Sequence, residues 1–180
     1  MPHYVAFLRG MNVGGHRITN EELCAQFTAI GFRDVRSFRA SGNIIFLSDA
    51  QGESELQSRI EAGLAAALGY GVPTFIRSAE EMGAIVAAEP FSKRRLASSS
   101  GKLQVALLGS PPPAKARKQV LALAVDGDAL GFGERELYWL PSGSVLDSPL
   151  DWKLIERLLG PLTMRTMGTV EQLAAKHLDG

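Results

Sequence analysis

The sequence contains one cysteine, Cys24, among its 180 residues. An internal disulfide is therefore excluded, and the lone thiol fits a reducing compartment. Cys24 lies in a helical pattern beside Leu23 and Phe27, which favours a semi-buried structural thiol over a nucleophile. Long apolar runs are also absent: none approaches the ~20 residues that a membrane-spanning helix requires, and the start lacks a signal-peptide pattern. We therefore expect a cytoplasmic protein that does not bind membranes.

Net charge is also absent, because nineteen Lys and Arg residues balance nineteen Asp and Glu residues. No overall field therefore draws the protein toward nucleic acid or an anionic membrane. The charge is unevenly distributed, however, with seven basic and no acidic residues from 93 to 118. This basic segment, 93–118, is either a solvated set of loop and helix charges or a contact surface for nucleic acid or another protein. The first interpretation is the commoner one, and the second stays as an alternative function.

Recognisable catalytic and metal-binding patterns are missing too. The three histidines, His3, His16 and His177, have no metal-ligand spacing and no supporting cluster of cysteine or carboxylate residues. The glycine-rich segment 10–15 matches neither the dinucleotide fingerprint nor a P-loop, which would need Gly-Lys-Ser/Thr at its end. We therefore predict no metal site, no cofactor and no catalytic residue, and the sequence leaves open whether the protein is an enzyme.

The residues that are present form an alternating pattern of strands and helices. In the first half, the pattern predicts strands at 3–9, 35–39, 43–47 and 72–77, and helices at 20–30 and 53–68. Thr19 and Glu22 have the spacing of a capping box at the start of the first helix, and Gly31 follows its end. The order is β-α-β-β-α-β, the split unit of ferredoxin-like domains.

The same order recurs in the second half of the chain. The pattern there predicts strands at 103–108, 129–132, 136–140 and 162–165, and helices at 114–125 and 151–159. A further helix closes each half, at 79–88 and 169–178. The predicted fold class is α+β, a tandem repeat of two ferredoxin-like units that are each followed by a helix and are either separate or share strands. The predicted domains are 1–90 and 102–180, on either side of a polar basic loop at 91–101.

This topology predicts that two loops of the first unit lie at the same edge of its sheet. The first and second strands run parallel with the third antiparallel between them, so the loop after strand one meets the turn between strands two and three. That edge gathers guanidinium groups, amide side chains, a hydroxyl and backbone amides, a set that suits an anion such as phosphate or carboxylate. The candidate ligand-binding residues are Arg9, Gly10, Asn12, Gly14, Gly15, Arg39, Ser41, Gly42 and Asn43.

A purely structural interpretation of the same residues stays open. The Gly14-Gly15 pair can simply turn the chain, Asn43 can stabilise the hairpin through its own backbone, and Arg9 can form a local salt bridge. The acidic pair Glu21-Glu22 occupies the positive end of the following helix and would repel an anion there. Any anion must therefore bind to the loops rather than to the helix start.

The segment Tyr4–Gly15 reads Y-V-A-x-L-R-G-x-N-V-G-G and carries a specific resemblance. Together with a helix ending in Gly-Phe and the segment Val35–Phe46, which contains Ser41-Gly42-Asn43, it is similar to the bacterial family catalogued as domain of unknown function 1697. Glu89-Pro90-Phe91 and Leu108–Pro112 also fit, so the resemblance extends over nearly the whole chain. It implies a cytoplasmic protein of two related α+β halves, and it implies no activity.

The C-terminal part departs from the family pattern. Members usually show Ser-Lys-Leu and, near the end, Thr-x-Arg-Asn-Trp-Asn-Thr-Val. This chain has Ser148-Pro149-Leu150 and the segment Thr163–Val170, which lack the lysine, both asparagines and the tryptophan. If those polar groups form a site in the family, this chain has lost part of it, whereas a site confined to the N-terminal loop is intact.

Overall fold

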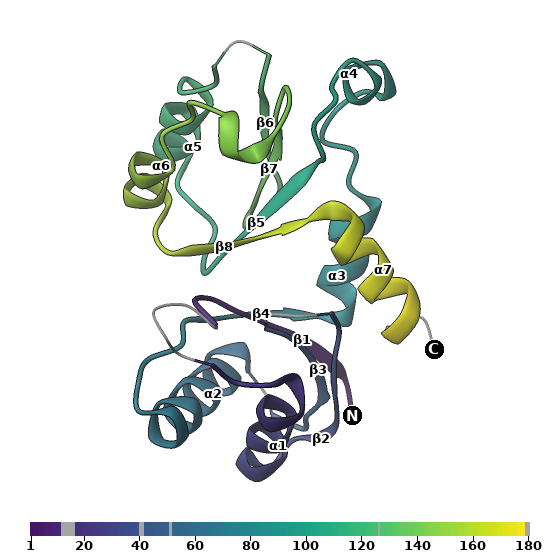
Figure 1. Ribbon diagram of the computed structural model, residues 1–180, viewed down its shortest axis with the longest axis vertical. Helices are drawn as coiled ribbons and strands as arrows, with labels where there is room; N and C mark the ends of the chain where they lie inside the picture. Colours follow the sequence, from purple (N-terminus) through teal and green to yellow (C-terminus); the bar gives the residue numbers. More distant parts are fainter. Residues whose placement is uncertain (12–16, 40–41, 51, 126, 179–180) are drawn as a thin grey trace. The chain divides into compact units, whose positions relative to one another are not determined.

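A computed structural model describes residues 1–11, 17–39, 42–50, 52–125 and 127–178 (Figure 1). The chain divides into two compact units. One unit comprises Met1–Gly83 together with the C-terminal segment from Leu173, and the other comprises Ala84–Gln172. The boundary falls within two helices, α3 (Ala79–Ala87) and α7 (Met167–His177), which follow the last strand of the first and second unit.

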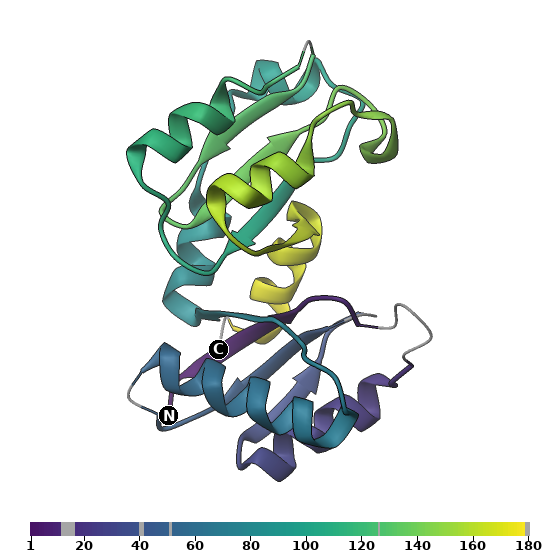
Figure 2. The ribbon, with the colours of Figure 1, turned by 90° about the vertical axis from the view of Figure 1, so that its left-hand side faces the viewer.

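The first unit contains a four-stranded antiparallel sheet in the order β2-β3-β1-β4. Its strands are β1 (His3–Leu8), β2 (Arg33–Ser37), β3 (Asn43–Leu47) and β4 (Thr74–Ser78). Two helices, α1 (Asn20–Ile30) and α2 (Glu53–Leu68), cover one face of this sheet (Figure 2). The order of elements is β-α-β-β-α-β, as the sequence predicted.

Helix α1 has the bounds that its sequence signals predicted. Thr19 Oγ1 accepts a hydrogen bond from Glu22 N at 3.1 Å, and Glu22 Oε2 accepts one from Thr19 N at 2.8 Å. This capping box satisfies amides that have no partner within the first helical turn. Gly31 ends the helix in the left-handed conformation with φ of 112°, which glycine adopts without steric cost.

The core of the first unit lies between the sheet and its two helices. Phe27 of α1 and Phe46 of β3 are fully buried, with ring centroids 5.7 Å apart, and the Phe32 ring lies 4.5 Å from that of Phe46. Leu56, Ile60 and other apolar residues of α2 pack into the same cluster. Burial of these large side chains is the main favourable term for the unit.

The second unit repeats the topology of the first, with strand order β6-β7-β5-β8. Its sheet and covering helices are β5 (Gln104–Leu108), β6 (Ala129–Phe132), β7 (Glu136–Leu140), β8 (Leu162–Thr166), α5 (Ala114–Leu121) and α6 (Trp152–Leu159). The central strands match in register: Tyr4 of β1 pairs with Phe46 and Ser78, and Gln104 of β5 pairs with Trp139 and Thr166. The two sheets are separate, so of the two predicted arrangements the one without shared strands is correct.

Several local expectations were wrong. Helix α5 ends at Leu121, four residues before the predicted end at 125. The stretch 91–101 is not entirely loop, because it contains the short helix α4 (Lys93–Ala97), which Ser92 caps by accepting a hydrogen bond from Arg95 N at 3.1 Å. Strand β2 begins two residues earlier than predicted and ends at Ser37. The β2–β3 pairing shifts register between Arg33 and Arg36, and Asp34 has a positive φ of 47°. Because this irregularity breaks the alternation of side chains along the strand, a simple alternation pattern does not give the correct bounds of β2.

Another short element, a 3-10 helix at Val145–Asp147, follows β7. Among the residues that the structure describes, no helix combines the length and the apolar composition needed to cross a membrane.

Replacing Thr19 by alanine removes one half of the capping box of α1. We expect the free energy of unfolding to fall by about 1 kcal/mol, measured by urea denaturation, because the Glu22 amide loses its acceptor. The matched control is Thr28→Ala on the same helix, where the hydroxyl only donates back to Cys24 O. That change should stay within about 0.5 kcal/mol of the unchanged protein. Equal losses in the two variants would contradict the role of the cap.

Candidate functional site

The loop after β1 and the connection between β2 and β3 meet at one edge of the first sheet. Strands β1 and β3 are antiparallel with Phe7 opposite Asn43, and Leu8 N donates a hydrogen bond to Gly42 O at 2.8 Å. Gly10 and Gly42 have positive φ angles of 75° and 83°. We call this edge of the sheet, formed by residues 9–11, 17–20, 39 and 42–43, the N-terminal edge.

Two further segments are tied to this edge. Arg9 N donates to Pro73 O at 3.0 Å, which joins the loop after β1 to the start of β4. Asn20 Nδ2 donates to Arg39 O at 2.8 Å, which joins the start of α1 to the end of the second strand. Segments that are far apart in sequence therefore converge at one end of the sheet.

Three arginines belong to the N-terminal edge. The sequence predicted Arg9 and Arg39 as candidate ligand-binding residues, whereas it gave no reason to select Arg17, which precedes the Thr19 cap by two positions. Its only signal in the sequence is a basic side chain in the loop that enters α1. The side chains of Arg17 and Arg39 are exposed and that of Arg9 is partly buried. The edge therefore carries positive charge from three separate segments.

Some candidate residues have structural roles at this edge. Asn43 is buried, and its side-chain Nδ2 donates to Phe38 O at 3.0 Å, so this amide stabilises the hairpin. Gly42 lies so close to Leu8 that a β-carbon would come within 3.0 Å of the Leu8 carbonyl oxygen. The Arg39 guanidinium carbon lies 5.5 Å from the centroid of the Phe38 ring, within the range of a cation–π contact. The remaining candidates, Asn12, Gly14, Gly15 and Ser41, lie outside the described residues, as does His16.

The acidic start of α1 takes part in its own cap. A hydrogen bond from the backbone of Thr19, with a second from its side chain, lowers the pKa of Glu22, so the carboxylate stays ionised beside the helix start. A negative charge at this position already interacts favourably with the helix dipole. An anionic ligand at this edge would therefore be held by the arginine-bearing loops.

Substituting Gly42 with alanine should destabilise the N-terminal edge. The positive φ of 83° disfavours any L side chain, and the new methyl group would crowd the Leu8 backbone. We expect a loss of about 1–3 kcal/mol in the free energy of unfolding, measured by chemical denaturation. Gly71→Ala is the control, because Gly71 has an unstrained φ and open space around its α-carbon. A loss no larger than that of the control would show that the edge does not require glycine.

The basic residues of the segment 93–118 are distributed over several elements of the second unit. Arg117 donates to Pro112 O at 3.0 Å and to Gly133 O at 2.6 Å, with its guanidinium 5.1 Å from the Phe132 ring. Arg95 donates to Gly127 O at 3.3 Å. The other basic residues are divided between α4, the start of β5 and α5, and the two helices lie apart in both views of the second unit (Figures 1 and 2). No observation favours the nucleic-acid alternative, which stays a prediction.

Asp128 organises the loops of the second unit. It is 6% exposed, and its carboxylate accepts hydrogen bonds from Trp139 Nε1 at 3.0 Å, Ser142 N at 2.8 Å and Ser148 Oγ at 2.7 Å. Burial alone would raise the pKa of Asp128, but these hydrogen bonds outweigh it and lower the pKa below its ordinary value of 3.8. One carboxylate thus ties the loop after β7 to the start of β6.

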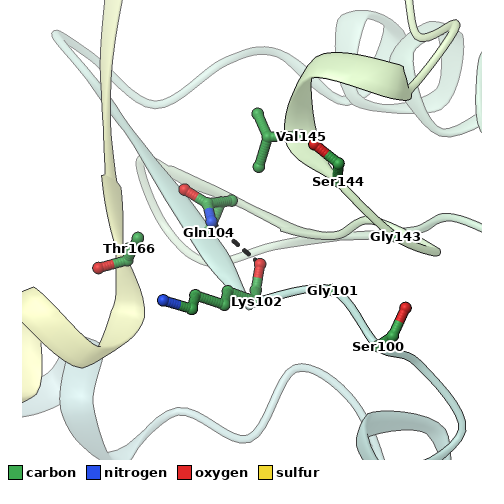
Figure 3. A pocket seen from close by; sticks show the side chains of 8 residues that line it. All are labelled: Ser100, Gly101, Lys102, Gln104, Gly143, Ser144, Val145 and Thr166. Atoms are coloured by element: carbon green, nitrogen blue, oxygen red, sulfur yellow. Dashed lines mark hydrogen bonds between the residues drawn. The ribbon is translucent and has the colours of Figure 1, made fainter.

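The same loop forms one wall of a pocket of about 400 Å³ in the second unit (Figure 3). Its lining residues come from the stretch before and at the start of β5, the loop after β7 and the end of β8. They are Ser100, Gly101, Lys102, Gln104, Gly143, Ser144, Val145 and Thr166. Sequence reasoning missed this pocket, and its only signals were the polar composition of 91–101 and a serine-glycine turn after β7.

The other titratable groups that the structure describes form no chemical centre. Burial raises the pKa of the Cys24 thiol, while a hydrogen bond with Ser37 acts in the opposite direction, which agrees with a structural thiol. Burial lowers the pKa of His177, with Arg36 adding to the effect, and its ring contacts Phe38 edge-on at 5.7 Å. Within the part of the chain that the structure describes, no three His, Cys, Asp or Glu residues lie together in a way that could hold a metal ion.

Replacing Asp128 by asparagine should destabilise the second unit. The new amide keeps one acceptor oxygen but turns a donor toward groups that themselves donate, so we expect a loss of about 1–3 kcal/mol in the free energy of unfolding at neutral pH. Because the folded pKa is lowered, the stabilisation by Asp128 is present above pH 3.8 and is lost as the pH falls below it.

Urea denaturation of the unchanged protein and the Asp128→Asn variant at a series of pH values tests this expectation. The two stabilities should converge in acid. Glu171→Gln, which removes an exposed carboxylate of α7, is the control and should have little effect at any pH. A constant difference between the unchanged protein and the Asp128→Asn variant across the whole pH range would exclude an ionised Asp128 as the cause.

Comparison with known proteins gives a family and a fold. A family model described as "Protein of unknown function (DUF1697)" matches residues 1–138, which confirms the resemblance carried by the N-terminal motif. The match ends before the divergent segment 163–170. No curated protein matches the chain. Among solved structures, the conserved bacterial protein SP0830 from Streptococcus pneumoniae is similar over 97% of each chain, with 20% sequence identity and a TM-score of 0.78. At this identity the likeness shows the fold alone.

Proposed function

The chain belongs to the family described as protein of unknown function (DUF1697), and we propose that it binds a small anionic ligand at the N-terminal edge. The ligand class is a phosphate, a nucleotide or a carboxylate, and the proposal concerns binding only. The observation that carries it is the convergence of three arginine-bearing segments at one end of the first sheet, tied together by the hydrogen bonds from Leu8 N to Gly42 O and from Asn20 Nδ2 to Arg39 O.

The chemistry of these groups supports an anion rather than a neutral ligand. A guanidinium group presents a planar fork of donors that matches carboxylate and phosphate oxygens and stays charged at neutral pH. Arg9 and Arg39 are the residues that we assign to charge recognition. The positive φ angles of Gly10 and Gly42 give a backbone path that approaches closely at this edge, and backbone amides in such turns can donate to an anion.

The local balance of charge also supports the proposal. The described segments of the edge contain three arginines and no carboxylate up to Asn20, and Glu22 at the start of α1 is engaged by Thr19. Charged loops that are held by hydrogen bonds lose less conformational freedom on binding than free loops, which favours affinity.

Titration of isotope-labelled protein with inorganic phosphate, AMP and citrate, followed by amide NMR shifts, tests the proposal. We expect saturable shifts at Arg9, Gly10, Arg39 and Gly42, with an affinity that falls as salt is added because the contacts are charged. Arg9→Gln and Arg39→Gln should each weaken binding about tenfold, since each removes a charge-assisted contact.

Arg33→Gln is the matched control, because Arg33 is an exposed arginine at the opposite end of β2. It should leave the affinity unchanged. No saturable shift at the N-terminal edge with any of the three probes at millimolar concentration would overturn the proposal. Equal weakening by Arg33→Gln would also overturn it, because the effect would then be one of net charge.

A further inference from the structure

The internal repeat shows how the pocket of the second unit arises. In the first unit, Tyr4 occupies the register position that matches Gln104, and its ring stacks on Phe46 with centroids 5.8 Å apart. Tyr4 therefore packs against the core between sheet and helices. In the second unit the smaller, polar Gln104 lies at this position, opposite Trp139 and Thr166, and the Trp139 ring packs instead on Trp152 of α6, with centroids 5.1 Å apart.

A difference in helix length between the two units also contributes to the pocket. Helix α2 has sixteen residues, whereas its counterpart α6 has eight. Both helices run toward the last strand of their unit, so α6 lacks the turns that in α2 lie nearest the start of the central strand. The connection from residue 141 to 151 replaces those turns and leaves the pocket between itself and Gln104 (Figure 3).

The walls of the pocket are held by hydrogen bonds between two loops. Ser99 Oγ donates to Pro141 O, and Ser100 Oγ donates to Ser142 O at 3.2 Å. Gly101 packs so tightly that a β-carbon would lie 2.2 Å from Pro141 O, so only glycine fits there. With the loop after β7 also tied to Asp128, the pocket is preorganised on both sides, which lowers the entropic cost of binding a ligand.

Two polar groups in this pocket have unused hydrogen-bonding capacity. Gln104 is 6% exposed, and its Nε2 donates to Lys102 O at 3.0 Å, which orients the amide and presents Oε1 to the pocket. No residue in the described ranges donates to this oxygen. Solvent reaches this oxygen, so a hydroxyl group of a ligand can take the place of water there. Ser144 Oγ accepts from Leu146 N at 3.3 Å, which leaves its proton for another acceptor.

Lys102 provides the charge. Its side chain extends along the pocket toward Thr166 in Figure 3, and among the residues that the structure describes none forms an ion pair with it. A lysine ammonium beside an open carbonyl acceptor is complementary to a ligand that carries both an anionic group and an N–H or O–H donor. The volume of about 400 Å³ is near the lower end of the range for small-molecule sites, so the ligand is small.

We propose that this pocket binds a small hydroxylated organic anion, a hydroxy acid or a polyol phosphate. Lys102 binds its carboxylate or phosphate, Gln104 Oε1 accepts a hydrogen bond from its hydroxyl group, and the Ser144 hydroxyl donates to a ligand oxygen. This site is separate from the N-terminal edge and does not depend on it.

Paired probes test each half of this recognition in the full-length, isotope-labelled protein. Malate and glycerol 3-phosphate carry both features, whereas succinate lacks the hydroxyl and glycerol lacks the charge. We expect malate or glycerol 3-phosphate to shift the amide signals of 100–104 and 143–145 saturably at millimolar concentration. Succinate and glycerol should bind at least about tenfold more weakly than their partners, the loss expected when a hydrogen bond or a charged contact is missing.

Variants separate specific contacts from general charge. Lys102→Ala should weaken binding of the better probe about tenfold, and Gln104→Met, which keeps the shape of the side chain, should abolish the preference for malate over succinate. Lys115→Ala on α5 removes the same charge from an exposed site outside the pocket and should have no effect. The proposal is overturned if neither malate nor glycerol 3-phosphate shifts these amides, if the shifts map to another surface, or if Lys115→Ala weakens binding as much as Lys102→Ala.

Discussion

The antiparallel pairing of each central strand with both of its neighbours is the constraint on which the rest of the structure depends. Because β1 pairs with β3 and β4, its exit must lie beside the turn before β3 and the start of β4, and the bonds from Leu8 to Gly42 and from Arg9 to Pro73 follow. The equivalent pairing of β5 puts Gln104 beside Trp139 and Thr166 at the opposite end of the strand. The two candidate sites therefore occupy opposite ends of equivalent central strands in the two repeats.

Because the two units share one topology, their differences can be compared position by position. The same strand order is covered by a helix of sixteen residues in the first unit and one of eight in the second. At the register position where the first unit has the aromatic ring of Tyr4, the second unit has Gln104, next to a loop held by hydrogen bonds. A hydrophobic core tolerates a polar side chain only where hydrogen bonds satisfy it. The partly satisfied amide of Gln104 is thus the feature that distinguishes the second unit chemically.

Polar groups that fasten loops recur through the molecule. Three side chains satisfy backbone or buried polar groups in this way. Asn43 donates to Phe38 O, Arg117 donates to loop carbonyl groups, and the Asp128 carboxylate accepts from three donors. In each case, residues that composition alone could assign to ligand binding or to a basic surface have a structural role. Arg9, Arg17 and Arg39 in one unit, and Lys102 in the other, are the charges on which the binding proposals rest.

The sequence by itself determined the family, the order of the sheet strands and their covering helices, and the bounds of α1, β3 and α2, because periodicity and capping are local. Thr19, Glu22 and Gly31 carry their signals within one helix. It also identified the glycine-rich edge, since strand order follows from the β-α-β-β-α-β pattern. Only the tertiary structure decided that β2 is irregular, that Asn43 stabilises its hairpin and that a pocket exists. The pocket depends on hydrogen bonds between residues 42 positions apart and on the residues that surround Gln104. Neither feature leaves a periodic signal in the chain.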